Sequence, residues 1–95
     1  MRNVPIRSIP LPGASSAVRN AQSIYCGFTI RETSGVAAAR VRLYDHATTA
    51  TGTILEEITL AAGKTLRCCY HGGLWAVNGI YAEIAGAVSG SVRIS

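Results

Sequence analysis

Hydrophobic and polar residues alternate along most of the chain after residue 22, the pattern of β-strands with one buried face. In the stretch 22–31, Ile24, Cys26, Phe28 and Ile30 are spaced two residues apart. Because successive side chains of a strand point to opposite faces, these four are expected to face the core together. Turn-forming residues at 32–35 end this strand.

The same alternation recurs in further segments. Strands are expected at 39–44, 53–60, 65–70, around 75–77, at 80–85 and at 91–94, with one more within 6–11. We expect 39–44 to pair with the first strand, and Asn78-Gly79 to form a tight hairpin turn. Glu56 falls on the apolar side of its strand, which a bulge or an edge position would accommodate.

These seven or eight short strands predict an all-β chain, with the strands antiparallel in a small β-sandwich or jelly roll. No 3.6-residue period lasts for three turns, so no helix is expected. The alanines at 37–39 favour a helix locally, but the run is too short and leads directly into alternation.

The first 21 residues have a different sequence pattern, with prolines at 5, 10 and 12 and no repeating apolar period. Proline removes backbone donors and disfavours helix and central strand. We therefore expect an extended N-terminal arm at 1–21 and a β-sandwich domain at 22–95; the alternative is a first edge strand packed on its own domain. The candidate partner-binding residues are Ile6, Ile9 and Leu11 as apolar anchors, with Arg2, Arg7 and Arg19 as cations for an acidic partner.

Composition favours association. Charged residues make up 15% of the 95 residues and hydrophobic residues 48%, whereas about 25% charged is usual. So few charges would cover an isolated surface poorly, which predicts a homo-oligomer or a subunit of a larger particle. The net charge of +4 comes from scattered residues, and only Arg40 and Arg42 share a strand face. A solvated or salt-bridging strand face fits them better than nucleic-acid binding.

No apolar stretch long enough for a membrane span, and no secretory signal, is apparent. We therefore expect synthesis in a cytoplasm and no membrane partner. Three cysteines, Cys26, Cys68 and Cys69, cannot all pair within the chain and are expected to be reduced.

Motifs for phosphate binding and ester hydrolysis are incomplete. Gly63-Lys64-Thr65 matches the end of a phosphate-binding loop, but Ile58 occupies the position of its first glycine, and a strand rather than a helix follows. His71-Gly72-Gly73 is similar to part of an esterase oxyanion loop, but the chain has no Gly-x-Ser-x-Gly elbow. We interpret both as turns.

Metal and acid–base sites are also poorly supported. The adjacent Cys68 and Cys69 should face opposite sides of a strand, so the cysteines and His71 do not form a convincing zinc set. Glu56 and Glu57 diverge in the same way and are better placed for ion pairs with arginines of a neighbouring strand or subunit. No catalytic residue, cofactor or metal is expected, and we expect the protein not to be an enzyme.

Several segments together resemble small virion structural proteins of tailed bacteriophages. The stretches that carry the resemblance are 27–35, 39–45, 51–55, 79–84 and 90–92. The resemblance implies a β-sandwich in the virion, made in the host cytoplasm, that binds viral coat protein or other virion subunits as a capsid decoration or minor head protein. A tail or head–tail component is the alternative location.

Two other functions remain open. One is a module that binds host-surface carbohydrate, which would need an exposed aromatic side chain near Tyr44 or Trp75, so a buried Trp75 would argue against it. The other is a small enzyme, which would need a deep pocket combining His46 or His71 with a carboxylate.

Overall fold

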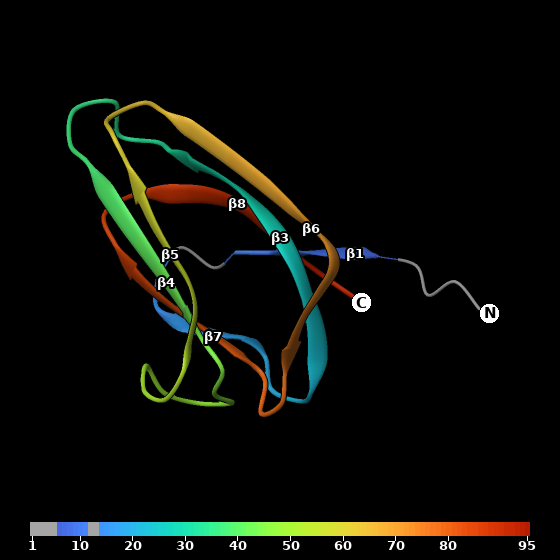
Figure 1. Ribbon diagram of the computed structural model, residues 1–95. Coiled ribbons are helices and arrows are strands. Elements are labelled where there is room, and N and C mark those ends of the chain that lie inside the picture. The colour runs from blue at the N-terminus through green and yellow to red at the C-terminus, as the bar shows by residue number, and fades with distance from the viewer. Residues whose placement is uncertain (1–5, 12–13) are drawn as a thin grey trace.

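The chain folds into two four-stranded antiparallel sheets packed face to face (Figure 1). The computed structural model describes residues 6–11 and 14–95. Sheet A has the strand order β1-β8-β3-β6, and sheet B has the order β2-β7-β4-β5. The strands are β1 (Arg7–Pro10), β2 (Ser16–Arg19), β3 (Ser23–Glu32), β4 (Ala39–Tyr44), β5 (Ile54–Leu60), β6 (Thr65–Ala76), β7 (Ile80–Ala85) and β8 (Val88–Ile94). The predicted all-β sandwich is confirmed.

The strand order is that of a jelly roll. β1 pairs with β8, β2 with β7, β3 with β6 and β4 with β5, as if one long hairpin had been wrapped into a sandwich. Two further pairings, β3 with β8 and β4 with β7, complete the sheets. Consecutive strands therefore lie in opposite sheets, except for the β4–β5 hairpin.

This topology overturns two expected pairings. The segment 39–44 does not pair with β3, because the chain crosses to sheet B after residue 32. Asn78-Gly79 does not close a hairpin either, since β6 and β7 belong to different sheets. Alternation identifies a strand and its buried face but says nothing about which strand lies beside it.

Most strand positions agree with the sequence pattern. The segments 39–44 and 80–85 are strands with the expected bounds, and no helix occurs in residues 6–11 and 14–95. The expected break at 71–73 is instead a bulge inside one long strand, β6, whose register with β3 shifts there. β2 was not expected, and β8 begins three residues earlier than predicted.

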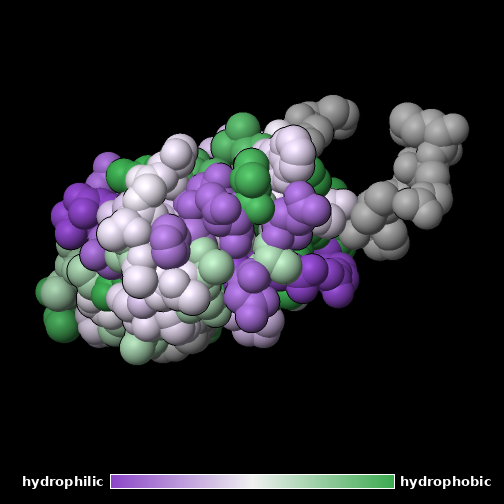
Figure 2. Space-filling model, turned by 90° about the horizontal axis from the view of Figure 1, so that it is seen from below, coloured by the Kyte–Doolittle hydropathy of each residue, from purple (hydrophilic) through white to green (hydrophobic). Residues whose placement is uncertain are grey.

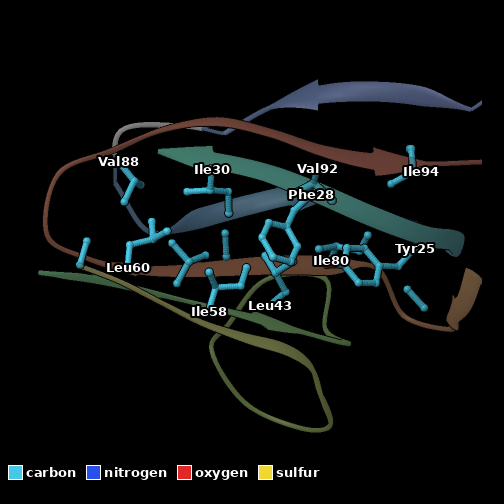
Figure 3. Close-up of a cluster of buried hydrophobic side chains, with 14 residues drawn as sticks. Tyr25, Phe28, Ile30, Leu43, Ile58, Leu60, Ile80, Val88, Val92 and Ile94 are labelled. Atoms are coloured by element: carbon cyan, nitrogen blue, oxygen red, sulfur yellow. The ribbon is translucent and has the colours of Figure 1, made fainter. Parts of the chain in front are cut away.

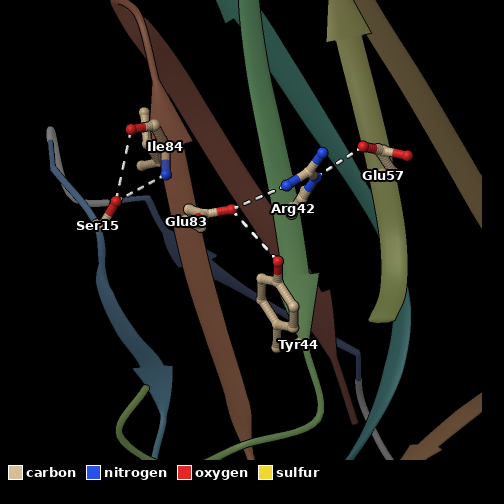
Figure 4. Close-up of polar contacts among 6 residues, drawn as sticks. All are labelled: Ser15, Arg42, Tyr44, Glu57, Glu83 and Ile84. Atoms are coloured by element: carbon tan, nitrogen blue, oxygen red, sulfur yellow. Dashed lines mark hydrogen bonds and ion pairs between the residues drawn. The ribbon is translucent and has the colours of Figure 1, made fainter. Parts of the chain in front are cut away.

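The segment before residue 22 contributes to both sheets. β1 pairs with β8 at the edge of sheet A, and β2 pairs with β7 at the edge of sheet B. Ser15 supports the second pairing, because its Oγ accepts a hydrogen bond from the Ile84 N–H at 2.8 Å (Figure 4). The expected boundary between residues 21 and 22 therefore does not mark the start of the sheets: 7–10 and 16–19 are edge strands, the alternative left open above.

The core lies between the sheets and is built from aliphatic and aromatic side chains of both (Figure 3). Its fully buried members include Tyr25 and Ile30 from sheet A and Leu43, Leu60 and Ile80 from sheet B. Hydrophobic burial of this kind is the main favourable contribution to folding.

A bulge in β3 changes which of its residues face this core. The register of β3 shifts between Tyr25 and Gly27 against both β6 and β8. Tyr25 is consequently fully buried in the core together with Phe28, whereas Ile24 is only half-buried. The expectation that Ile24 faces the core with Phe28 is wrong, because the extra residue inverts the alternation on one side of the bulge. Cys26 is buried, as expected.

Glu32, at the end of β3, ties two loops together. Its carboxylate accepts hydrogen bonds from the Ser34 hydroxyl at 2.6 Å, the Ser34 and Gly35 backbone N–H groups at 2.8 Å each, and the Gly63 N–H at 2.9 Å. The Ser34 hydroxyl and these backbone donors lower the pKa of Glu32 to about 2, against the opposing effect of burial. The turn after β3 and the turn between β5 and β6 are thus fixed to one another.

Candidate functional site

The β6 edge of sheet A carries several exposed apolar side chains. β6 is 12 residues long and pairs only on its β3 side. On β6, Leu66 is 44% exposed, Leu74 45% and Trp75 62%, and Val77 just beyond the strand is 52% exposed. A long edge strand with exposed apolar residues is a natural place for another chain to dock.

The outer face of sheet A carries arginines. On β3, Phe28 and Ile30 point into the core, so Thr29 and Arg31 point outward. Arg67 of β6 lies directly opposite Thr29, and Arg93 of β8 bonds the Thr29 hydroxyl through Nη2. Three arginines therefore lie on this face near Thr29, and one of them, Arg93, bonds its hydroxyl.

The outer face of sheet B is different, because its central arginine is paired with two carboxylates. Arg42 on β4 lies in register with Glu57 on β5 and with Glu83 on β7. Its Nε donates to Glu57 at 2.7 Å, its Nη1 lies 3.5 Å from Glu83, and the Tyr44 hydroxyl also donates to Glu83 at 3.3 Å (Figure 4). This pairing raises the pKa of Arg42 and lowers that of Glu57. The expected salt bridge is confirmed for Arg42 and Glu57. Arg40 is exposed and forms no ion pair within the described residues, and the ion pair expected for Glu56 is not formed, because its carboxylate accepts hydrogen bonds from two tyrosines instead.

Glu56 points between the sheets and is held by two tyrosines. The Tyr25 hydroxyl donates to Glu56 Oε1 at 3.2 Å, and the Tyr70 hydroxyl donates to the same oxygen. Burial, and then the Glu56 carboxylate, raises the pKa of Tyr25; the hydrogen bond to Glu56 is the main cause of the raised pKa of Tyr70. Both phenols therefore stay protonated as donors. The two rings also pack at a tilt of 54°, with centroids 5.8 Å apart.

The position of Glu56 agrees with both structural alternatives expected for it. β5 is the edge strand of sheet B, and its register with β4 shifts beside Glu56, between the pairs formed by Leu43 and Tyr44. The two tyrosines that satisfy the carboxylate were not foreseen. Only the conflict between a carboxylate and an apolar strand face signalled that it would need buried partners.

The structure separates the predicted partner-binding residues into two groups. Ile6, 60% exposed, and Arg7 are accessible beside β1. Ile9 and Leu11 instead pack against the domain's own core, and Arg19 is half-buried at the end of β2. Arg2 lies outside the described residues. The six positions therefore do not form one accessible surface.

The cysteines are all free thiols. Cys26 is buried, and burial raises the pKa of its thiol. Cys68 packs against the core while Cys69 is exposed, so these neighbours face opposite sides as predicted. Among the side chains that the structure describes, which do not include that of His71, no group of three or more Cys, His, Asp or Glu is arranged to hold a metal ion.

The other sequence motifs lie in turns and strands. Lys64 follows the positive-φ Gly63 in the β5–β6 turn, and Thr65 begins β6, as the turn interpretation predicted. The segment 71–73 lies in the β6 bulge rather than in a turn that ends a strand. The Trp75 side chain is exposed, so the condition set for a carbohydrate platform is met, whereas Tyr44 is only 8% exposed.

Comparisons with protein-family models, with curated proteins and with solved structures found no match to this chain. Over the described part of the chain, no helix is long and apolar enough to cross a membrane. Figure 2 shows one side of the molecule, where hydrophilic and hydrophobic residues are interspersed.

Proposed function

We propose that this protein is a non-enzymatic structural subunit of a virus particle that binds neighbouring subunits through the β6 edge of sheet A. The observation that carries the proposal is the group of exposed apolar residues on and just after β6, namely Leu66, Leu74, Trp75 and Val77. Exposed aromatic and aliphatic side chains beside an unpaired strand edge gain stability when another chain covers them.

Two further observations support this function. Jelly rolls recur in viral capsid proteins, although they also occur in lectins and cupins. The fold therefore supports the proposed function by analogy alone. The resemblance of the sequence to small phage virion proteins favours the viral use, as a capsid decoration or minor head protein, with a tail or head–tail component as the alternative. The low charged fraction of 15% fits a subunit that is covered on assembly.

The N-terminal segment contributes to binding through fewer residues than the sequence suggested. Ile6 and Arg7 are exposed and accessible to a partner. Ile9 and Leu11 are already engaged with the core. A deletion of residues 1–20 would remove β1 and β2, so point substitutions at Ile6 and Arg7 are the appropriate test of this segment.

The test is the composition of purified particles. Virus particles from cells that carry the gene should contain the protein in many copies by mass spectrometry. Particles made without it should bind the purified wild-type protein, whereas a Leu74→Ser/Trp75→Ser variant should bind at least tenfold more weakly. Val36→Ser is the control, because Val36 is 85% exposed but lies in the β3–β4 loop. Absence of the protein from particles, or full binding by the double variant, would refute the proposal.

Carbohydrate binding is the second candidate, and the exposed Trp75 side chain favours it. An accessible indole offers a flat apolar face on which a sugar ring can stack. A glycan array separates the two functions: glycan binding that is lost in Trp75→Ala, together with absence from particles, would support the carbohydrate module instead.

A further inference from the structure

We infer that the outer face of sheet A docks an acidic surface of a partner protein through Arg31, Arg67 and Arg93. The inference rests on the proposed function, because it specifies the chemistry of the subunit that is bound. It is carried by arginines of three strands, whereas the proposed function is carried by the apolar residues of the β6 edge.

Strand register brings the three arginines together around Thr29. Arg67 is the direct cross-strand neighbour of Thr29, and Arg31 is two residues further along β3. Arg93 lies opposite Gly27 on the other side, and its Nη2 donates to the Thr29 hydroxyl. Direct and diagonal neighbours on one sheet face are about 5 and 7–8 Å apart. The register therefore places the three arginines in one region of the outer face.

The positive charge on this face is not balanced by carboxylates. The five acidic residues of the chain all lie elsewhere. Glu32 is engaged with two loops, Glu56 points between the sheets, Asp45 is in the β4–β5 loop, and Glu57 and Glu83 are on sheet B. The outward neighbours of the arginines are hydroxyl residues instead, since Arg31 lies opposite Thr65 and Ser89.

Sheet B provides the internal comparison. Its central arginine, Arg42, is paired with Glu57 and Glu83 within the same chain. Arg31 and Arg67 are exposed, and the described residues offer them no carboxylate. Complementary charge from outside the chain would satisfy them, and arginine can hold a carboxylate through two parallel hydrogen bonds.

A protein partner suits this face better than a nucleic acid. The apolar residues Ile24 and Trp75 are cross-strand neighbours on the same outer face, beyond Cys69. A face that combines arginine and tryptophan with other apolar residues is typical of protein–protein interfaces. A single-stranded nucleic acid would favour several aromatic stacking platforms along a cationic groove, and this face offers only one tryptophan.

The experiment measures binding of the intact protein to an immobilised oligoglutamate peptide by interferometry at low ionic strength. We expect Arg31→Gln and Arg67→Gln each to weaken binding, and the double variant to weaken it about tenfold. Arg40→Gln removes the same charge from an exposed position on sheet B and should have little effect. Arg93 is left intact because it also contacts the Cys68 carbonyl.

Each outcome bears on one proposal. Equal weakening by Arg40→Gln, or unchanged binding by the double variant, would overturn the inference. Tighter binding to an oligothymidylate of equal charge would replace the protein partner by nucleic acid. If particles contain the protein and retain the Arg31→Gln/Arg67→Gln variant fully, the arginine face fails while the proposed function stands. If the protein is absent from particles but its oligoglutamate binding needs these arginines, the proposed function fails and the anionic specificity of the face stands.

Discussion

Tyr25 and Glu56 meet between the two sheets, where the buried Tyr25 hydroxyl donates to Glu56 Oε1 at 3.2 Å. They are 31 residues apart in the sequence and lie on strands of different sheets, β3 in sheet A and β5 in sheet B. Tyr70 donates to the same oxygen from β6. A single carboxylate thus links three strands at the side of the sandwich where β5 and β6 are the free edges.

Removal of this carboxylate should destabilise the fold. Glu56→Ala leaves the hydroxyls of Tyr25 and Tyr70 without their acceptor, and we expect a loss of about 2 kcal/mol in the free energy of unfolding, measured by urea denaturation. Tyr25→Phe in the Glu56→Ala background should cost less than Tyr25→Phe in the wild type, since the hydroxyl is then already unpaired. Equal costs in both backgrounds would show that the pair is not coupled.

Glu32 should make stability depend on acid pH. Its pKa is about 2 in the folded chain and about 4.3 in an unfolded one. Because the folded-state pKa is the lower one, the stabilisation is fully present above about pH 5 and is lost as the pH falls towards 2. Denaturation curves between pH 7 and 2 should show a steeper loss for the wild type than for Glu32→Gln. Parallel pH profiles would contradict the role of Glu32 in fixing the two loops.

Gly27 is required where the register between β3 and β6 shifts. Its φ of 134° is unfavourable for other residues, and an added Cβ would overlap the Cys68 carbonyl oxygen. Gly27→Ala should therefore cost more than about 2 kcal/mol of stability. Gly35→Ala is the matched control, since Gly35 also has a positive φ of 75° but a Cβ there would meet nothing within 4 Å. Thermal unfolding that ranks the two variants equally would argue against the close contact.

Trp75 should report on binding rather than on folding. Because its side chain is 62% exposed, Trp75→Ala should change the free energy of unfolding by no more than about 0.5 kcal/mol. The fluorescence of this only tryptophan should be readily quenched by acrylamide in the free protein. We expect protection from quenching and a blue shift when a partner covers β6. A tryptophan already protected in the free monomer would contradict its exposure.

The sequence could predict the strands but not their neighbours. Alternation placed 39–44 and 80–85 correctly, because period-2 burial is a local property of the chain. It missed the exchange of buried and outward-facing positions at Tyr25, since a one-residue bulge leaves no mark in composition. It also assigned Asn78-Gly79 to a hairpin, although the same turn chemistry serves a crossing between sheets.

The features of the candidate surfaces were also only partly predictable from the sequence. The lack of a catalytic motif and the pairing of Glu57 with a neighbouring arginine could be inferred from residue types and spacing, whereas the exposure of Trp75 could not. The cluster of Arg31, Arg67 and Arg93 was not, because these residues come from three strands and approach only through the register of sheet A.

By itself, the sequence determined that this chain is a small all-β protein with few charges and an apolar surplus, since those properties depend on local periodicity and composition. The tertiary structure alone decided that residues 7–10 and 16–19 form two edge strands and that the sheets follow jelly-roll order. It also decided that Arg31 and Arg67 of sheet A meet no carboxylate among the described residues, while Arg42 of sheet B is paired with two. The reason is physical: strand pairing joins residues far apart in the chain, and which carboxylate reaches which arginine depends on that pairing.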